Sequence, residues 1–518
     1  MTSTASNFST APAGGVSVGG TTFINLGIQG VGRYSASATD PDTGETLGSF
    51  SGMQITGWSK DSNGTYSGVF QTLPDRGYNS GSTYSNYAAR INSFNFTFTP
   101  YASNATTTNQ NQITMSFAGS TRFTYDHDNN VATAPIYTTG LLPTTSNGSL
   151  FGKTVPVVST STTQSDGTFA SRLCLDAEAI AFDNRSGKAG SGWVGDEYGA
   201  NIYHFNSSKQ IDGILGTPAA LQPTNSGNFS FASDPLNGRR TNQGFEGVGV
   251  SPDGTKLFAL LQSATIQDSG SGSVGRSNTR LLVYDLSSSD TPTASVTEHV
   301  IQLPLVDDNG GSFALNKTAA QSEIVVLNNT QFLILARDGN GRGANTTAPV
   351  FKSVLLADIS TASNILSQFD AEGNQVAPSG VLNASVTPIT WSEALNMMGK
   401  VDLSITELEQ FGFNYNANNG DMNTISEKWE AMSLVSANDP NAPNDYFLFL
   451  ANDNDFTTAS VKMFDASGTL QTYSGTLEND NVVLAYRVQV VPEPSTLVLL
   501  VLAGVGLLVV RSRMARRA

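Results

Sequence analysis

The chain has 518 residues and a formal net charge of −16, and 50 of its residues are glycine. This acidic balance, without a basic stripe, argues against a nucleic-acid partner. The single cysteine, Cys174, excludes a disulfide within the chain, and its apolar neighbours predict a buried and inert thiol. Abundant Gly, Ser, Thr and Asn, with almost no amphipathic helical pattern, predict one large all-β unit.

The two ends of the chain differ from its body. Residues 1–20 are rich in Ser, Thr and Gly and carry no charged side chain, which predicts a disordered lead-in. They also lack the basic start and apolar run of a secretory signal peptide. We expect the folded body to occupy residues 21–490 and a separate tail to occupy residues 491–518.

The segment 176–203 sets a pattern that the rest of the chain repeats. Residues 176–183 alternate acidic or small residues with apolar ones, as in a strand with one buried face. A second apolar strand follows at Gly192, and it ends in Asp196 and Glu197. Two adjacent carboxylates at the end of an apolar strand are costly unless water, a metal ion or a cation receives them.

The same strand, turn, strand and polar end recur in four looser copies. These copies span residues 51–77, 244–262, 322–339 and 430–455. Their spacing exceeds the roughly 40–50 residues of compact propeller repeats, so long insertions must separate them. A β-propeller is the natural architecture for radial repetition, because each blade turns its innermost strand toward a central channel. We therefore predict an all-β propeller whose carboxylates gather at one mouth of the channel.

Three stretches outside the copies carry predictions of their own. The alternating segment Phe94–Thr99, within residues 92–150, predicts an edge or insertion hairpin, and Glu393–Glu409 predicts a helical insertion. Asp126-His127-Asp128 could be a metal pair, but a solvated loop is the favoured interpretation. His204 is expected to be a packing residue, and no Gly-x-Ser-x-Gly elbow supports Ser-His-Asp catalysis.

Taken in order, several motifs resemble the phytase-like domain family, also described as the esterase-like activity of phytase. They cover roughly residues 45–490 and are Pro74-Asp-Arg-Gly77, Asp176-Ala-Glu-Ala-Ile-Ala181, Asp196-Glu-Tyr-Gly199, Gly244-Phe-Glu-Gly247 with Ser-Pro-Asp-Gly254, Arg337-Asp338 and Asn452-Asp-Asn-Asp455. Two positions depart from the pattern: Gln262 stands where an acidic residue is expected, and Ala431 replaces a glycine. The resemblance implies phosphoester hydrolysis.

Nine acidic residues are the candidate metal ligands. They are Glu178, Asp196, Glu197, Glu246, Glu323, Asp338, Glu430, Asp453 and Asp455. Hard oxygen ligands of this kind select Ca²⁺, which takes about 6–8 of them. Bound Ca²⁺ would let an acidic protein attract a phosphate ester and would lower the pKa of a water for attack. The alternative is that these acids cap turns and strand ends through backbone N–H groups.

Four residues are the candidate catalytic groups: Asp196, Glu197, Arg76 and Arg337. The two arginines could clamp phosphate oxygens bidentately. The main alternative to an enzyme is a non-catalytic, Ca²⁺-stabilised surface or extracellular-matrix binding propeller. A lactonase-type hydrolase is a third possibility, and it predicts turnover of esters rather than phosphates.

The C-terminal tail has a composition of its own. Val491-Pro-Glu-Pro494 precedes an apolar run at residues 497–510 and an arginine cluster at residues 511–517. Fourteen apolar residues form a helix of about 21 Å, short of a ~30 Å hydrocarbon core unless flanking residues extend it, and the arginines place its end in the cytoplasm.

The tail resembles the PEP-CTERM sorting signal. The resemblance implies bacterial export, processing by an exosortase near Pro492–Pro494, and release or attachment in the cell envelope. The tail would contact the membrane before processing. Because such a signal needs an export signal at the front, we expect the true N-terminus to lie upstream of residue 1, with an unusual export route as the alternative.

Overall fold

The computed structural model describes residues 15–48, 50–80, 83–101, 109–126, 136–144, 147–159, 171–231, 234–308, 315–344, 347–399, 407–417 and 420–492. The predicted C-terminal hydrophobic helix, His127 and Asp128 lie outside these residues. The lead-in predicted for residues 1–20 ends earlier than expected, because Val16–Val18 forms strand β1 and pairs with β2. Among the described residues, no helix is long and apolar enough to cross a membrane.

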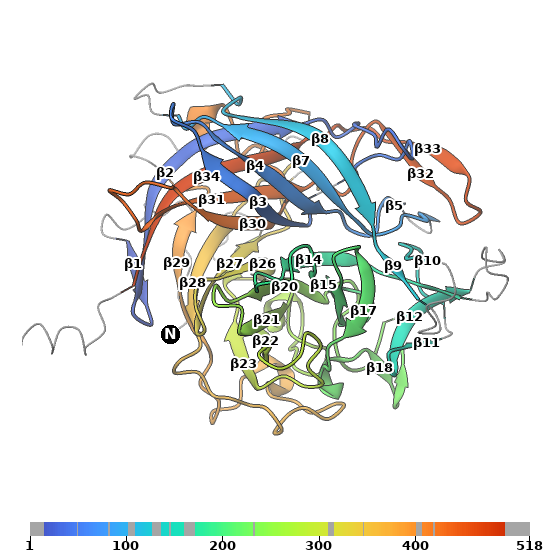
Figure 1. The fold of residues 1–518 in the computed structure, drawn as a ribbon. Helices are drawn as coiled ribbons and strands as arrows, with labels where there is room; N and C mark the ends of the chain where they lie inside the picture. The colour runs from blue at the N-terminus through green and yellow to red at the C-terminus, as the bar shows by residue number, and fades with distance from the viewer. Residues whose placement is uncertain are drawn as a thin grey trace, which may run out of the picture.

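Five sheets of four or more strands, antiparallel except for the pairing of β17 with β9, make up most of the described chain (Figure 1). The first sheet contains β3 (Gly52–Lys60), β4 (Tyr66–Leu73), β7 (Arg90–Phe98) and β8 (Ile113–Arg122). The second contains β14 (Ala177–Phe182), β15 (Gly192–Asp196), β16 (Ile202–Phe205) and β17 (Gln210–Ile214), extended by β9 (Thr124–Tyr125) and β10 (Ile136–Tyr137). The third contains β20 (Phe245–Val250), β21 (Lys256–Leu261), β22 (Asn278–Asp285) and β23 (Thr297–Gln302).

The last two sheets complete a ring. The fourth contains β26 (Ala320–Val326), β27 (Gln331–Arg337), β28 (Lys352–Asp358) and β29 (Thr390–Asn396). The fifth contains β30 (Lys428–Ser436), β31 (Asp445–Asp453), β34 (Asn481–Pro492), β2 (Thr21–Tyr34) and β1. The inner strands β3, β14, β20, β26 and β30 contact one another in this order, and β30 returns to β3. The chain is therefore a five-bladed β-propeller, which confirms the predicted fold class.

The five predicted copies supply the two innermost strands of the five blades. Smaller elements lie in the connections between strands, both within blades and between them. They are β5 (Asn79–Ser80), β6 (Thr83–Tyr84), β11 (Asn147–Leu150), β12 (Lys153–Ser159), β13 (Ser171–Leu173), β18 (Thr224–Asn225), β19 (Asn228–Phe229), β24 (Leu305–Val306), β25 (Lys317–Thr318), β32 (Ser460–Phe464), β33 (Leu470–Ser474) and the short 3-10 turns η1 (Ala219–Leu221), η2 (Ser273–Arg276), η3 (Pro378–Gly380) and η4 (Glu409–Phe411).

The fifth blade joins both ends of the described chain. Strand β2 pairs with β34 from Thr21 opposite Pro492 to Tyr34 opposite Asn481. In Figure 1 the blue N-terminal strand β2 lies beside the red β34. The ring is thus closed by backbone hydrogen bonds between β2, near the start of the described chain, and β34, its last strand.

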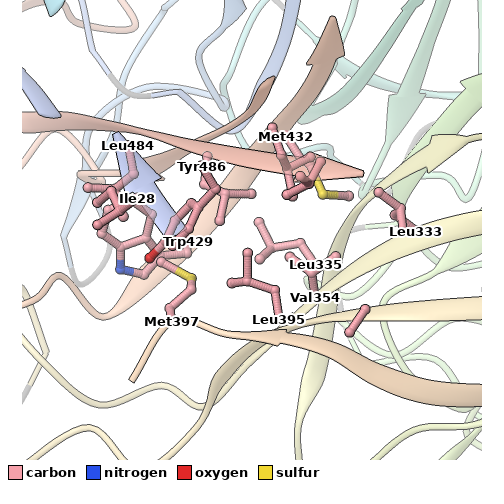
Figure 2. Close-up of a cluster of buried hydrophobic side chains, with 14 of the residues drawn as sticks. Ile28, Leu333, Leu335, Val354, Leu395, Met397, Trp429, Met432, Leu484 and Tyr486 are labelled. Carbon is pink, nitrogen blue, oxygen red and sulfur yellow. The ribbon is translucent and has the colours of Figure 1, made fainter. Parts of the chain in front are cut away.

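Apolar side chains fill the space between neighbouring blades. Figure 2 shows Leu333, Leu335 and Val354 of the fourth blade facing Trp429 and Met432 of the fifth. All five are buried. Since burying one such side chain contributes about 1.5–3 kcal/mol, this packing holds each inner strand against its neighbour. The polar ends of these strands are thereby fixed around one mouth.

One predicted element, the helical insertion, is wrong. The predicted helix Glu393–Glu409 begins within β29, the outer strand of the fourth blade, whose Leu395 packs in the same cluster as Val354. Of the rest, residues 400–406 lie outside the described residues, and Glu409–Phe411 forms only a 3-10 turn. The segment Phe94–Thr99 lies mostly in β7, which pairs with the edge strand β8, so it belongs to an edge hairpin of the first blade rather than to an insertion. Its rings pack on aromatic neighbours of the first and fifth blades, which explains its alternation.

Candidate functional site

One mouth of the propeller collects the starts of the inner strands and the ends of the second strands. Antiparallel pairing places these ends side by side: Ala177 lies opposite Asp196, and Lys428 lies opposite Asp453. Polar residues that the sequence places at strand ends in separate copies therefore meet at one edge of the ring.

A β-bulge aims a glutamate into this mouth in three of the blades. Pairing skips Glu178 between Ala177 and Ala179, and it skips Glu246 and Glu430 in the same way. A bulge adds one residue to a strand, bends it and redirects a side chain, and bulges are common beside active sites. The small residue that follows each of these glutamates reflects the crowded channel wall.

Seven carboxyl groups form a continuous cluster at the mouth. Three sets share members, and within each set one oxygen per residue lies within 4.8 Å of the others. The sets are Asp176, Glu178 and Glu197; Glu178, Glu430 and Asp453; and Asp75, Asp453 and Asp455. All seven are buried except Asp455, which is partly exposed. We call these seven residues the acidic cluster.

Three cationic side chains offset part of this charge. Arg76 forms an ion pair with Asp176, and Arg337 forms one with Glu430. Lys428 lies 2.8 Å from an oxygen of Asp455. Three cations against seven carboxyl groups leave an excess of negative charge in a region that water enters poorly. A divalent cation held by oxygen ligands would remove that excess.

Burial and mutual repulsion disturb the pKa values of the acidic cluster. Burial, and then the neighbouring Asp176, raises the pKa of Glu178 well above its usual range and that of Glu197 to about 7. Burial and then other carboxylates likewise raise the pKa of Asp75 and Asp453. Burial also opposes the charged form of Glu430, but Arg337 and Lys428 outweigh it and bring this pKa to about 2. The site therefore combines one firmly charged carboxylate with several that resist ionisation unless a cation is present.

Two predicted ligands, Asp196 and Asp338, already use their carboxylates in structural hydrogen bonds or ion pairs. Asp196 accepts hydrogen bonds from the backbone N–H groups of Asp176, Tyr198 and Gly199, so it braces the turn that carries Glu197. Asp338 forms a buried ion pair with Lys352 and accepts backbone N–H groups from the loop before β28. Neither residue belongs to the acidic cluster.

Two further predicted ligands belong to none of the three sets that make up the acidic cluster. Glu246 accepts a hydrogen bond from Gln262, the position noted above as a departure from the family pattern. In the fourth blade the bulge falls at Ser322, because pairing runs from Gln321 to Glu323. Glu323 is thereby displaced by one residue and lines the central channel.

Three residues of the site were not predicted from the sequence. Asp75 follows β4 as Glu197 follows β15, and its place in the Pro-Asp-Arg-Gly motif was the available signal. Asp176 precedes Glu178 by two residues in the strongest motif. Lys428, at the start of β30, carried no sequence signal, because its role depends on pairing with β31.

A cavity of about 560 Å³ adjoins the acidic cluster at Asp455. Its lining includes Tyr78, Phe456 and Thr458. The ring of Tyr78 stacks on that of Tyr473 with centroids 4.9 Å apart. This space is large enough to hold the organic part of a small substrate beside the carboxylates.

Fold and site together define a five-bladed propeller with an acidic mouth. The chain belongs to the phytase-like family: the family model described as esterase-like activity of phytase matches residues 45–456. The PEP-CTERM protein-sorting motif matches residues 490–517. An uncharacterized secreted protein of Arthroderma benhamiae is 31% identical over 496 residues, which cover 87% of this chain and 92% of that protein.

Solved propellers are similar to this chain only distantly. The Dos1 propeller shares 8% identity with a TM-score of 0.28, over 89% of this chain and 94% of that one. The PQQ-bound aldose sugar dehydrogenase of Streptomyces coelicolor shares 10% identity with a TM-score of 0.29, over 90% and 98%. These values carry no argument about function.

Proposed function

We propose that this protein is an exported, Ca²⁺-dependent phosphoester hydrolase whose site is the acidic cluster. The observation that carries the proposal is the convergence of seven carboxyl groups from three blades and their connections at one mouth. Capping of turns does not require such convergence. Oxygen-only donors also match the preference of Ca²⁺ better than that of softer metals.

The residues around the acidic cluster suit an anionic substrate once a cation is bound. Glu178, Glu430 and Asp453 would hold Ca²⁺ on the channel side. Bound Ca²⁺ would polarise the phosphoryl oxygens and stabilise the charge that develops on them. Arg76 keeps partial exposure at the rim, so its guanidinium can bind a phosphate oxygen while still paired with Asp176.

Glu197 is the candidate general base. In the metal-free protein its pKa is about 7, close to the value at which a carboxylate both exists in the charged form and accepts a proton readily. Arg337, which the sequence analysis placed among the catalytic groups, is proposed instead to keep Glu430 ionised as a ligand. Asp196 is proposed as a positioning residue for Glu197.

The C-terminal motif and the secreted relative support export of the mature protein. We propose a division into a lead-in before β1, a propeller that runs from β1 to the end of β34 at Pro492, and a sorting tail from there to residue 518. The motif implies processing by an exosortase, and the tail would contact the membrane only before that step. A small phosphoester is the proposed substrate.

The test uses the full-length protein stripped of metal with EGTA and resupplied with Ca²⁺. Hydrolysis of p-nitrophenyl phosphate and a panel of natural phosphoesters should require Ca²⁺ and fall at least 100-fold in Glu178→Gln. Glu372→Gln, the same chemical change on an exposed loop, is the matched control and should keep full activity.

Two other outcomes would refute hydrolysis of phosphoesters. Stabilisation by Ca²⁺ without turnover on the whole panel would assign the acidic cluster to a non-catalytic binding propeller. Turnover of lactones or carboxylic esters but not phosphates would assign it to a lactonase-type hydrolase.

A further inference from the structure

A second cavity, of about 240 Å³, contains three arginines in a protein that is strongly acidic overall. Arg90, Arg122 and Arg172 line it together with Glu45, Tyr137 and Phe464. None of these residues belongs to the acidic cluster. Arg90 opens β7 and Arg122 ends β8, and the two are direct cross-strand partners. Like charges directly opposite each other destabilise a sheet unless something neutralises them.

The charges of these arginines are only partly compensated within the described residues. Arg90 is buried and pairs with Glu45 at 2.7 Å, with Asp40 farther away at 3.9 Å. Arg172 donates only to neutral acceptors, namely the carbonyls of Tyr137 and Thr138 and the side chain of Asn86. Burial lowers its pKa, as expected for a cation without a carboxylate partner.

Arg122 has the most available guanidinium of the three. It forms no hydrogen bond or ion pair with any residue of the described ranges. Its guanidinium lies over the ring of Tyr137, 3.9 Å from the centroid. Stacking of this kind orients the planar group while leaving its N–H fork free to bind an oxyanion bidentately.

The cavity also contains an acceptor that lacks a donor. The Oε1 atom of Glu45 is buried and has no hydrogen-bond partner, whereas the Oε2 atom is paired with Arg90. A buried acceptor without a donor is costly, so a ligand that supplies a hydroxyl there gains binding energy. A simple inorganic oxyanion such as sulfate offers no hydroxyl for this purpose.

We propose that this cavity binds one acidic sugar, a monosaccharide unit that carries a carboxylate. The carboxylate pairs with Arg122 and Arg172, and a sugar hydroxyl donates to Glu45. The apolar face of the ring packs against Tyr137 and Phe464. The cavity volume equals about eight waters at ~30 Å³ each, which suits a single sugar ring rather than a longer chain.

This site is independent of the proposed hydrolytic function, because it uses no acidic-cluster residue and needs no metal. The test therefore runs on the full-length protein in EGTA. Isothermal titration calorimetry with D-glucuronate should give saturable binding near one site per chain, and D-glucose should give none. Binding should be unchanged in Glu178→Gln, which removes a ligand of the proposed Ca²⁺ site.

Two arginine variants assign the site. Arg122→Gln should weaken glucuronate binding at least tenfold, and Arg122→Lys, which keeps the charge but lacks the fork, should weaken it several-fold. Arg276→Gln, a partly exposed arginine on η2 that does not line this cavity, should bind like wild type. Circular dichroism confirms folding of each variant, and Arg122→Lys suffices if Arg122→Gln does not fold.

Three results would overturn the proposal. The first is the absence of saturable glucuronate binding. The second is binding that the folded Arg122 variants leave unchanged. The third is sulfate binding as tightly as glucuronate, since the cavity would then recognise charge without the sugar hydroxyl.

Discussion

Glu178 comes from the second repeat and Asp453 from the fifth, yet their carboxylate oxygens lie within 4.8 Å of each other and of Glu430. Glu178 stands on the inner strand of the second blade, and Asp453 ends the second strand of the fifth. Only ring closure brings them together. The free energy of the ring and the occupancy of the acidic cluster are therefore coupled, and this coupling can be measured.

Calcium should stabilise the folded protein. Ca²⁺ at about 100 times its Kd should raise the free energy of unfolding by about 2.7 kcal/mol, because it binds only the folded ring. Urea denaturation in EGTA and in Ca²⁺ measures this difference. Asp453→Asn should reduce it, and an equal gain in Asp453→Asn and wild type would place the ion elsewhere.

Without metal, stability should fall as pH rises through the range set by Glu197. Its folded pKa of about 7 exceeds its ordinary value of 4.5, so the folded state binds the proton more tightly than the unfolded state. The favourable contribution is complete below pH 4.5 and is lost by about pH 7, a change of about 3 kcal/mol. Denaturation of wild type and Glu197→Gln across this range isolates the effect. The prediction would be wrong if the free energy of unfolding of wild type, relative to that of Glu197→Gln, increased as the pH rises.

Two of the three glutamates at bulges, Glu178 and Glu430, belong to the acidic cluster and are expected to bind metal. Glu430→Gln, at a bulge, should lower Ca²⁺ affinity at least tenfold, because it removes a member of the acidic cluster. Glu323→Gln should leave the affinity within about twofold, since the bulge at Ser322 displaces that side chain into the channel. Calorimetric titration of both variants measures the contrast, and equal losses would show that Glu323 also reaches the ion.

The contact between the fourth and fifth blades should dominate the stability of the ring. Leu335→Ala removes a fully buried side chain from this cluster and should cost about 2–5 kcal/mol, measured by urea denaturation. Leu470→Ala, whose side chain is 41% exposed on β33, is the control and should cost less than about 0.5 kcal/mol. A much smaller loss of stability in Leu335→Ala would mean that the neighbouring side chains between the fourth and fifth blades repack into the space.

The sequence predicted much of this architecture because the repeat is local. Each copy is one apolar strand, a turn and a second strand. The copies at residues 176–203 and 430–455 can therefore be recognised from the local sequence alone. The same reasoning failed for Glu323, since a shift of one residue at a bulge depends on pairing and leaves no local trace. It failed for Asp338 because Lys352, its partner, lies on the neighbouring strand. It mistook β29 for a helix, because one buried face of a strand and one stripe of a helix both supply clustered apolar residues.

The pairing of β2 with β34 sets the order in which this molecule can mature. The last strand of the ring ends at Pro492, and the sorting motif starts at residue 490. Synthesis must therefore reach the tail before β34 can pair with β2. A chain that stops earlier leaves the fifth blade incomplete. Cleavage at Pro492–Pro494 would cut directly after β34. The released protein would therefore be fully folded only if β34 had already paired with β2 before cleavage.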